Sequence, residues 1–150
     1  MKRILIYIAA LALLTLVPVK EADIGSLHPV EVVLIYREGD EVVMKTDTGD
    51  WGKGTDGLSA LKNLKDTTPG TIYLDTAEYL LIGEGTEETV DELRSVLKKS
   101  VRVCKADKEV DPQEATDFLS VHGTLPQLKT WKTGGDLPKL TVVAERLKMS

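Results

Sequence analysis

The sequence predicts a small α/β (α+β) protein in which helices pack on a mixed β-sheet. The 150 residues are 42% hydrophobic and 29% charged, which is ordinary usage for a globular chain with one core. Apolar runs rich in β-branched residues alternate with segments whose leucines recur at helical spacing. We therefore expect the element order ββαβαβα, followed by a C-terminal hairpin.

The N-terminus predicts export. Two basic residues precede an almost uninterrupted apolar run over residues 4–19, the order typical of a signal peptide or signal anchor. As a helix this run would span about 24 Å, slightly less than a hydrocarbon core of roughly 30 Å. Ala22 is the one small-residue stop, but Lys20 stands where cleavage prefers a small residue. We thus expect residues 1–19 to be a cleaved signal or an N-terminal membrane anchor.

This N-terminus also predicts where the rest of the chain lies. Positive charge ahead of the apolar run favours an N-inside orientation, which places the following domain outside the cytoplasmic membrane. The protein would then remain at the cell membrane through its anchor, or be secreted after cleavage. Membrane contact is expected through this segment alone.

The first half of the domain begins after a polar tether over residues 20–29. Residues 30–36 predict a strand, Glu38-Gly39-Asp40 a hairpin loop, and residues 41–46 its antiparallel partner. Residues 47–54 contain three glycines and are expected to form a flexible loop. A short helix follows, which Thr55 or Asp56 can cap and whose leucines share one face: Leu58, Leu61 and Leu64.

The next predicted elements alternate between strand and helix. Apolar runs at residues 72–74 and 79–82 predict strands, the second central in the sheet. Thr86 can cap a helix that reaches Lys98 and Lys99 and buries three apolar residues: Val90, Leu93 and Leu97. Residues 101–104 predict a strand that contains the one cysteine, Cys104, as a buried residue.

The domain over residues 30–123 should end with a helix. Asp111-Pro112-Gln113-Glu114 is a capping box, and Gly123 provides the stop. Its apolar face should consist of Ala115, Phe118 and Leu119. Residues 124–150 are expected to be an extension, with a hairpin between residues 128–132 and 140–144 across Gly134-Gly135.

Charge and composition exclude several classes of function. From Lys20 onward the chain has 17 basic and 24 acidic residues, so it should repel nucleic acid and anionic lipid. One cysteine cannot form an internal disulfide. His28 and His122 lack a second ligand at zinc spacing. The sequence therefore assigns no catalytic residue, cofactor or metal.

One triplet supports a competing hypothesis. Asp47-Thr48-Gly49 matches the motif that carries the catalytic aspartate of aspartic proteases, where two carboxylates share a proton. Only one such triplet exists, so activity would require a dimer. A secreted or membrane-tethered hydrolase is thus the alternative to a binding module, and a turn after a strand explains the same residues.

The glycine-flanked residues Trp51 and Lys53 are the candidate partner contact. The surrounding segment lacks the glycine and Ser or Thr positions of a phosphate-binding loop. Trp is enriched among the residues that anchor protein interfaces. Trp51 could instead fold back onto the sheet, since the core has few aromatic residues.

The segment IYLDTAEYLLIGE over residues 72–84 resembles part of the N-terminal domain of Ger(x)C-type spore germination proteins. The likeness covers about residues 24–122. Asp75 and Thr76 stand where that family has Gly-His, and its lipid-modified cysteine and larger C-terminal portion are missing. The resemblance implies a shared fold and a non-enzymatic envelope component of germination or sporulation, whose partner is an envelope or membrane protein.

Overall fold

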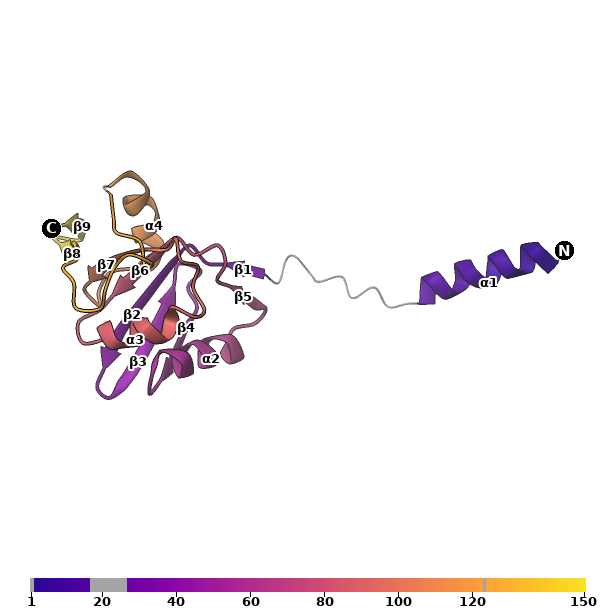
Figure 1. Cartoon of the computed structure of the whole chain (residues 1–150), viewed down its shortest axis with the longest axis horizontal. Coiled ribbons are helices and arrows are strands. Elements are labelled where there is room, and N and C mark those ends of the chain that lie inside the picture. Colours follow the sequence, from indigo (N-terminus) through magenta and orange to yellow (C-terminus); the bar gives the residue numbers. More distant parts are fainter. Residues whose placement is uncertain (1, 17–26, 123) are drawn as a thin grey trace.

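The computed structural model describes residues 2–16, 27–122 and 124–150 (Figure 1). The N-terminal apolar run forms helix α1 (Lys2–Leu16). Residues 17–19, the end of the expected signal or anchor, lie outside the described residues. No helix within the described ranges is both long and apolar enough to cross a membrane.

A mixed sheet organises the described part of the domain, with strand order β4-β3-β2-β6-β7-β8-β9. Its strands are β2 (Val32–Glu38), β3 (Glu41–Thr46), β4 (Trp51–Gly54), β6 (Tyr79–Ile82), β7 (Arg102–Ala106), β8 (Lys139–Val143) and β9 (Arg146–Met149). The central strands β2, β6, β7 and β8 run parallel, whereas β3, β4 and β9 are antiparallel to their neighbours. Two short strands, β1 (Leu27–Pro29) and β5 (Thr71–Tyr73), form a separate parallel pair. The fold is therefore of the predicted α+β class.

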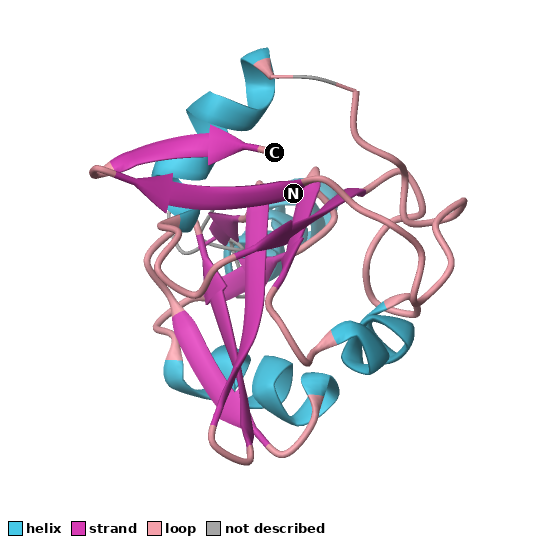
Figure 2. Cartoon of the chain, turned by 90° about the vertical axis from the view of Figure 1, so that its left-hand side faces the viewer, coloured by secondary structure: helices cyan, strands magenta, loops and turns pink. Residues whose placement is uncertain are grey.

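Helices cover both faces of this sheet. Because side chains alternate along a strand, Val33 and Ile35 of β2 join one core cluster while Val32 and Leu34 join another. Helices α2 (Gly57–Thr67) and α3 (Glu87–Leu93) bury leucines in the first cluster, and α4 (Pro112–Val121) packs on the second. Figure 2 shows the final hairpin, beside the C-terminal label, at one end of the sheet.

Several predicted elements are confirmed. The β2–β3 hairpin has the predicted loop, in which Gly39 adopts φ 62°, the conformation that a glycine supplies readily at the first position of a two-residue turn. β6 lies between β2 and β7, as expected of a central strand. Asp56 caps α2 by accepting a 2.7 Å hydrogen bond from the Ser59 N–H. Cys104 is fully buried in β7.

Two segments expected to be irregular are strands. Leu27–Pro29, placed in the tether, pairs with β5. Trp51–Gly54, placed in a flexible loop, is the edge strand β4. Gly52 and Gly54 are required there because a Cβ atom on either would lie 2.4 Å from a backbone nitrogen of α2. The glycines thus allow close packing of a helix on a strand, which the loop interpretation missed.

The α3 helix differs from its prediction at both ends. Thr86 makes no side-chain cap; its hydroxyl instead donates to the Gly83 carbonyl at 2.7 Å. The helix ends at Leu93, before the two lysines expected in its last turn. A 3.0 Å hydrogen bond from the Leu97 N–H to the Leu93 carbonyl extends the turn, so Leu97 is still buried as predicted.

Helix α4 begins at the predicted residue with Asp111 as its N-cap, but no hydrogen bond within the described residues joins the Glu114 side chain to the Asp111 N–H, as a capping box requires. The Asp111 carboxylate accepts a 2.9 Å hydrogen bond from the Gln113 N–H, and Pro112 is the first helical residue. Ala115 and Leu119 are buried, whereas Phe118 is half-buried and stacks on the His122 ring. The expected stop at Gly123 lies outside the described residues.

Residues 124–150 belong to the domain rather than to an extension. Leu128 and Trp131 are buried in an irregular segment, where the Arg94 guanidinium donates to both of their carbonyls. The expected hairpin across Gly134-Gly135 is wrong. The hairpin joins β8 to β9 through Ala144 and Glu145, which both adopt positive φ, of 50° and 61°. Non-glycine residues at those positions gave no sequence signal for the turn.

Candidate partner-binding surface

Trp51 and Lys53 lie together on the open face of edge strand β4. Gly52 and Gly54 face α2, so strand alternation directs the side chains of Trp51 and Lys53 to the opposite face. The Lys53 ammonium lies over the Trp51 ring, 5.7 Å from its centroid. The Trp51 side chain is 54% exposed. The structure therefore brings the two predicted contact residues together, an exposed indole beside a half-buried lysine.

A second pair of a lysine and an aromatic ring lies beside the first, but its ring, Tyr36, is buried. Lys45 of β3 is directly opposite Trp51 in the register, so the two side chains share a face. The Lys45 ammonium lies 5.3 Å from the centroid of the Tyr36 ring. We call Tyr36, Lys45, Trp51 and Lys53 together the Trp51 surface.

Hydrogen bonds hold the backbone beneath Trp51 in place. The Lys53 N–H, on the free side of β4, donates to the Asn63 side chain of α2 at 3.0 Å. Before the strand, the Asp50 carboxylate accepts a 2.6 Å bond from the Thr48 hydroxyl and lies 2.8 Å from Nδ1 of His28 in β1. Trp51 is therefore presented by a strand fixed on both sides.

Clefts adjoin Trp51 on both sides. One, of about 310 Å³, lies toward the end of α2 and includes Asn63, Thr67 and Pro69. The other, of about 450 Å³, is bounded by Lys45 and by the loop after β7, including Lys108 and Glu109. A partner side chain placed against the indole could therefore enter either hollow.

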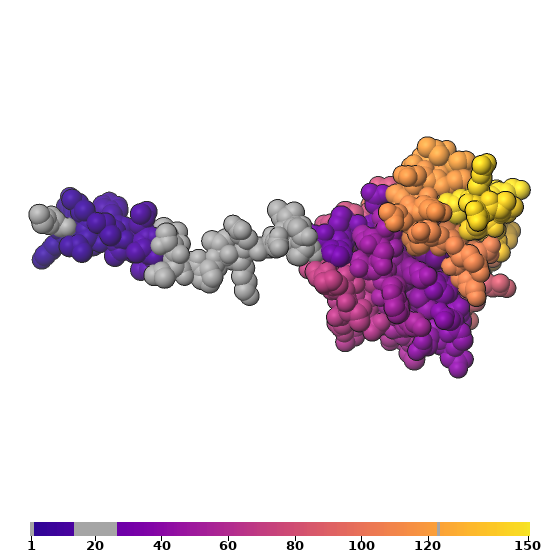
Figure 3. Space-filling view, turned by 180° about the vertical axis from the view of Figure 1, so that it is seen from behind, coloured from indigo at the N-terminus to yellow at the C-terminus, as the bar shows by residue number. Residues whose placement is uncertain are grey.

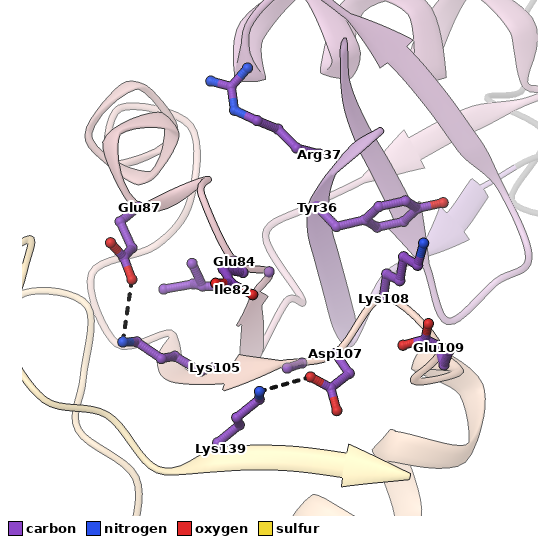
Figure 4. Close-up of a pocket in the computed structure, with 12 residues that line it drawn as sticks. Tyr36, Arg37, Ile82, Glu84, Glu87, Lys105, Asp107, Lys108, Glu109 and Lys139 are labelled. Carbon is purple, nitrogen blue, oxygen red and sulfur yellow. Dashed lines mark ion pairs between the residues drawn. The ribbon is translucent and has the colours of Figure 1, made fainter. Parts of the chain in front are cut away.

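A third cleft, larger than the two beside Trp51, lies at the carboxyl ends of the parallel strands. Its volume is about 600 Å³, and its charged lining comes from the ends of β2, β6 and β7 and the start of β8 (Figure 4). The chain leaves β6 toward α3 on one face and leaves β7 toward α4 on the other. Diverging connections open a crevice at this edge of a parallel sheet, where ligands commonly bind.

Opposite charges are paired within this cleft. Lys105 lies 3.3 Å from Glu87, and Lys139 lies 2.9 Å from Asp107, as the dashed lines in Figure 4 mark. The hydrogen bond and charge of Asp107 raise the pKa of Lys139, with a smaller contribution from Glu84. Both pairs are partly exposed, so they orient side chains more than they stabilise the fold.

Lys108 and Glu109 line both this charged cleft and the 450 Å³ cleft beside Trp51. The loop after β7 therefore connects the charged crevice with the Trp51 surface. Sequence reasoning did not identify this crevice. The sequence signal for it was the position of charged residues within three residues of the ends of two predicted strands, at Glu84 and at Asp107.

Asp47 has a structural role in this arrangement. Its Oδ1 atom accepts hydrogen bonds from the backbone N–H groups of Glu31 and Val32, at 2.9 and 3.1 Å. These bonds fix the start of β2 against the turn that follows β3. Among the described residues, no hydrogen bond joins a second carboxyl group to Asp47, and no group of His, Cys, Asp or Glu is arranged to hold a metal ion.

No known protein family, curated protein or solved structure matches this chain. The fold and the site define its class: an α+β domain that presents an exposed tryptophan beside charged clefts.

Proposed function

We propose that this domain is a non-enzymatic interaction module that binds a protein partner through the Trp51 surface. The observation that carries the proposal is the 54% exposure of Trp51 on a strand that hydrogen bonds and a packed helix hold in place. Because the backbone that carries the ring is already fixed, it loses little conformational freedom on binding, so more of the contact energy contributes to affinity. The structural alternative, in which Trp51 folds back into the core, finds no support in this exposure.

The surroundings of Trp51 fit the anatomy of a protein interface. Interfaces commonly combine a central aromatic anchor with a polar rim. Here Lys45 and Lys53 flank the ring, and the loop carrying Lys108 and Glu109 borders the adjoining cleft. We infer that the ring supplies most of the affinity and that the charges select the partner.

The proposal includes a location and a biological setting. Residues 1–19 would export the domain and hold it at the outer side of the cytoplasmic membrane unless they are cleaved. The partner would then be an envelope or membrane protein. The resemblance of residues 72–84 to the Ger(x)C-type domain supports a setting in spore germination or sporulation.

The test compares two exposed apolar residues. Trp51→Ala should weaken crosslinked capture of an envelope partner by the full chain about 30-fold, because truncating an interface anchor costs about 2 kcal/mol or more. Leu58→Ala is the matched control, since Leu58 is 45% exposed on α2. Both variants should melt within a few degrees of the wild type. Equal capture by all three proteins, or a large fall in melting temperature for Trp51→Ala, would refute the proposal.

The hydrolase alternative has its own test at Asp47. Asp47→Asn retains the Oδ1 acceptor for the two backbone N–H groups, so the variant should fold normally. We expect the wild type and the variant to behave alike in a peptidase assay. Peptide cleavage by the wild type that disappears in Asp47→Asn would favour the hydrolase instead.

A further inference from the structure

The two edges of the main sheet differ in how they are covered. At the β4 edge, α2 packs against Gly52 and Gly54, and the outward Lys53 N–H already bonds to Asn63. This edge has little room for another strand. β9 is the opposite edge strand. The β8–β9 hairpin lies at the molecular surface, drawn in yellow in Figure 3.

The hydrogen-bond register shows which backbone groups of β9 face outward. Lys139 and Ser150 exchange two backbone hydrogen bonds, of 2.8 and 2.9 Å. In an antiparallel pair, hydrogen-bonded and non-hydrogen-bonded positions alternate. Lys148 therefore bonds to β8, whereas the N–H and C=O groups of Leu147 and Met149 point away from it. No hydrogen bond within the described residues occupies these outward groups.

The side chains of β9 differ between its two faces. Arg146 and Lys148 are exposed on one face. Leu147 and Met149 lie on the other, partly buried against the core cluster below α4. Residues 139–150 carry three basic residues and one acidic residue, although the chain as a whole has a net charge of −5. The edge is thus a basic and half-apolar strip on an acidic protein.

We propose that β9 binds a partner strand whose residues alternate between acidic and apolar. Added antiparallel to β9, that strand would pair its backbone with Leu147 and Met149. Its acidic side chains would face Arg146 and Lys148, and its apolar side chains would extend the Leu147 face. A second copy of this chain fits poorly. Pairing two β9 strands would place the basic Arg146 and Lys148 of one copy close to the same basic residues of the other, and like charges repel.

The first test measures binding of a defined probe to the full chain in detergent micelles. The probe is a fluorescein-labelled peptide of seven alternating Glu and Val residues, and fluorescence anisotropy reports its affinity. The double variant Arg146→Glu, Lys148→Glu should weaken binding at least about tenfold, because it places like charges opposite each other. The matched control Lys129→Glu, Lys132→Glu makes the same charge change at other exposed positions and should leave affinity within about twofold.

Amide hydrogen exchange provides the second readout. In the free chain, the Leu147 and Met149 amides should exchange quickly, while the Lys148 amide is already protected by β8. Saturating peptide should slow exchange at Leu147 and Met149 at least about tenfold. Absence of binding up to about 1 mM peptide, or binding without this protection, would overturn the proposal.

Two further results would also overturn it. Protection of Leu147 and Met149 that rises with protein concentration alone would assign the edge to a second copy of the chain. Loss of peptide binding in Trp51→Ala would assign the peptide to the Trp51 surface. Retention in that variant is the expected result, and it keeps the edge proposal separate from the proposed function.

Discussion

Gly52→Ala tests whether β4 is a packed strand or a flexible loop. A Cβ atom at position 52 would lie 2.4 Å from the Leu64 nitrogen and 2.6 Å from the Ala60 carbonyl oxygen. These are backbone atoms of α2, so no side-chain rotation relieves the overlap. Ordinary contact begins at 3.4 Å, and the helix would have to shift by about 1 Å.

The expected cost follows from the packing around α2. Ala60 and Leu64 are fully buried, so a shift of α2 would open a gap between them and the rest of the core. A gap approaching 1 Å removes a quarter to a half of the energy of each dispersion contact. Overpacking changes typically cost 1–3 kcal/mol, so we expect Gly52→Ala to lower the free energy of unfolding by about 3 kcal/mol. That is a large share of the roughly 5–15 kcal/mol that stabilises a typical domain.

Urea denaturation followed by fluorescence measures this cost. Gly49→Ala is the control, because position 49 has open space around it and only its positive φ of 86° opposes a side chain. It should cost about 1–2 kcal/mol. A free energy of unfolding for Gly52→Ala within about 0.5 kcal/mol of the wild type would restore the loop interpretation.

Three further predictions concern the core, the thiol and the final turn. Leu81→Ala and Leu93→Ala should each lower the free energy of unfolding by about 2–5 kcal/mol, because both side chains are buried; unchanged urea midpoints would refute the assigned core. Burial raises the pKa of Cys104 from 9.0 to about 12, so the folded thiol should resist alkylation at pH 8 until urea unfolds the chain. The unfolded thiol loses its proton at a lower pH than the folded thiol, so the free energy of unfolding should fall as pH rises from about 9 to 12. Cys104→Ala should reduce this dependence on pH. Glu145→Gly should raise the free energy of unfolding by about 1 kcal/mol, because glycine adopts the positive φ at this position without strain; an unchanged melting temperature would contradict this.

Much of the fold could be predicted because its local signals agree. The β2–β3 hairpin combines apolar strands with a glycine turn, and Asp56 caps α2 as predicted. Of the expected leucine face, Leu61 and Leu64 are buried, but Leu58 is exposed. Asp111 also caps a helix that begins at the predicted residue. In each case the signal lies within a few residues of the element it specifies.

The missed features depend on contacts between distant residues. β4 has the glycines of a loop, but they are there because α2 approaches its backbone closely. Leu128 and Trp131 lie in a segment without regular structure, and Arg94 holds them in place from more than 30 residues away. Neither contact could be predicted from the residues close to it in the sequence.

The candidate site was likewise predictable where its signal is local and not where it depends on contacts between distant residues. The sequence identified Trp51 and Lys53 because a tryptophan among glycines is unusual. It could not show that Lys45 and Tyr36 lie beside them, since that proximity comes from strand pairing. The charged crevice escaped notice because its lining comes from four strand ends and the loops between them.

The most direct test of the interaction module is photocrosslinking from position 51 in living cells. Trp51→p-benzoylphenylalanine keeps an aromatic ring at the proposed contact, and the same substitution at Tyr73 serves as the control because Tyr73 is exposed on β5. We predict that light links position 51, but not position 73, to one envelope protein, and that excess wild-type chain competes the adduct away. No adduct at position 51, or the same adducts from both positions, would contradict binding through the Trp51 surface.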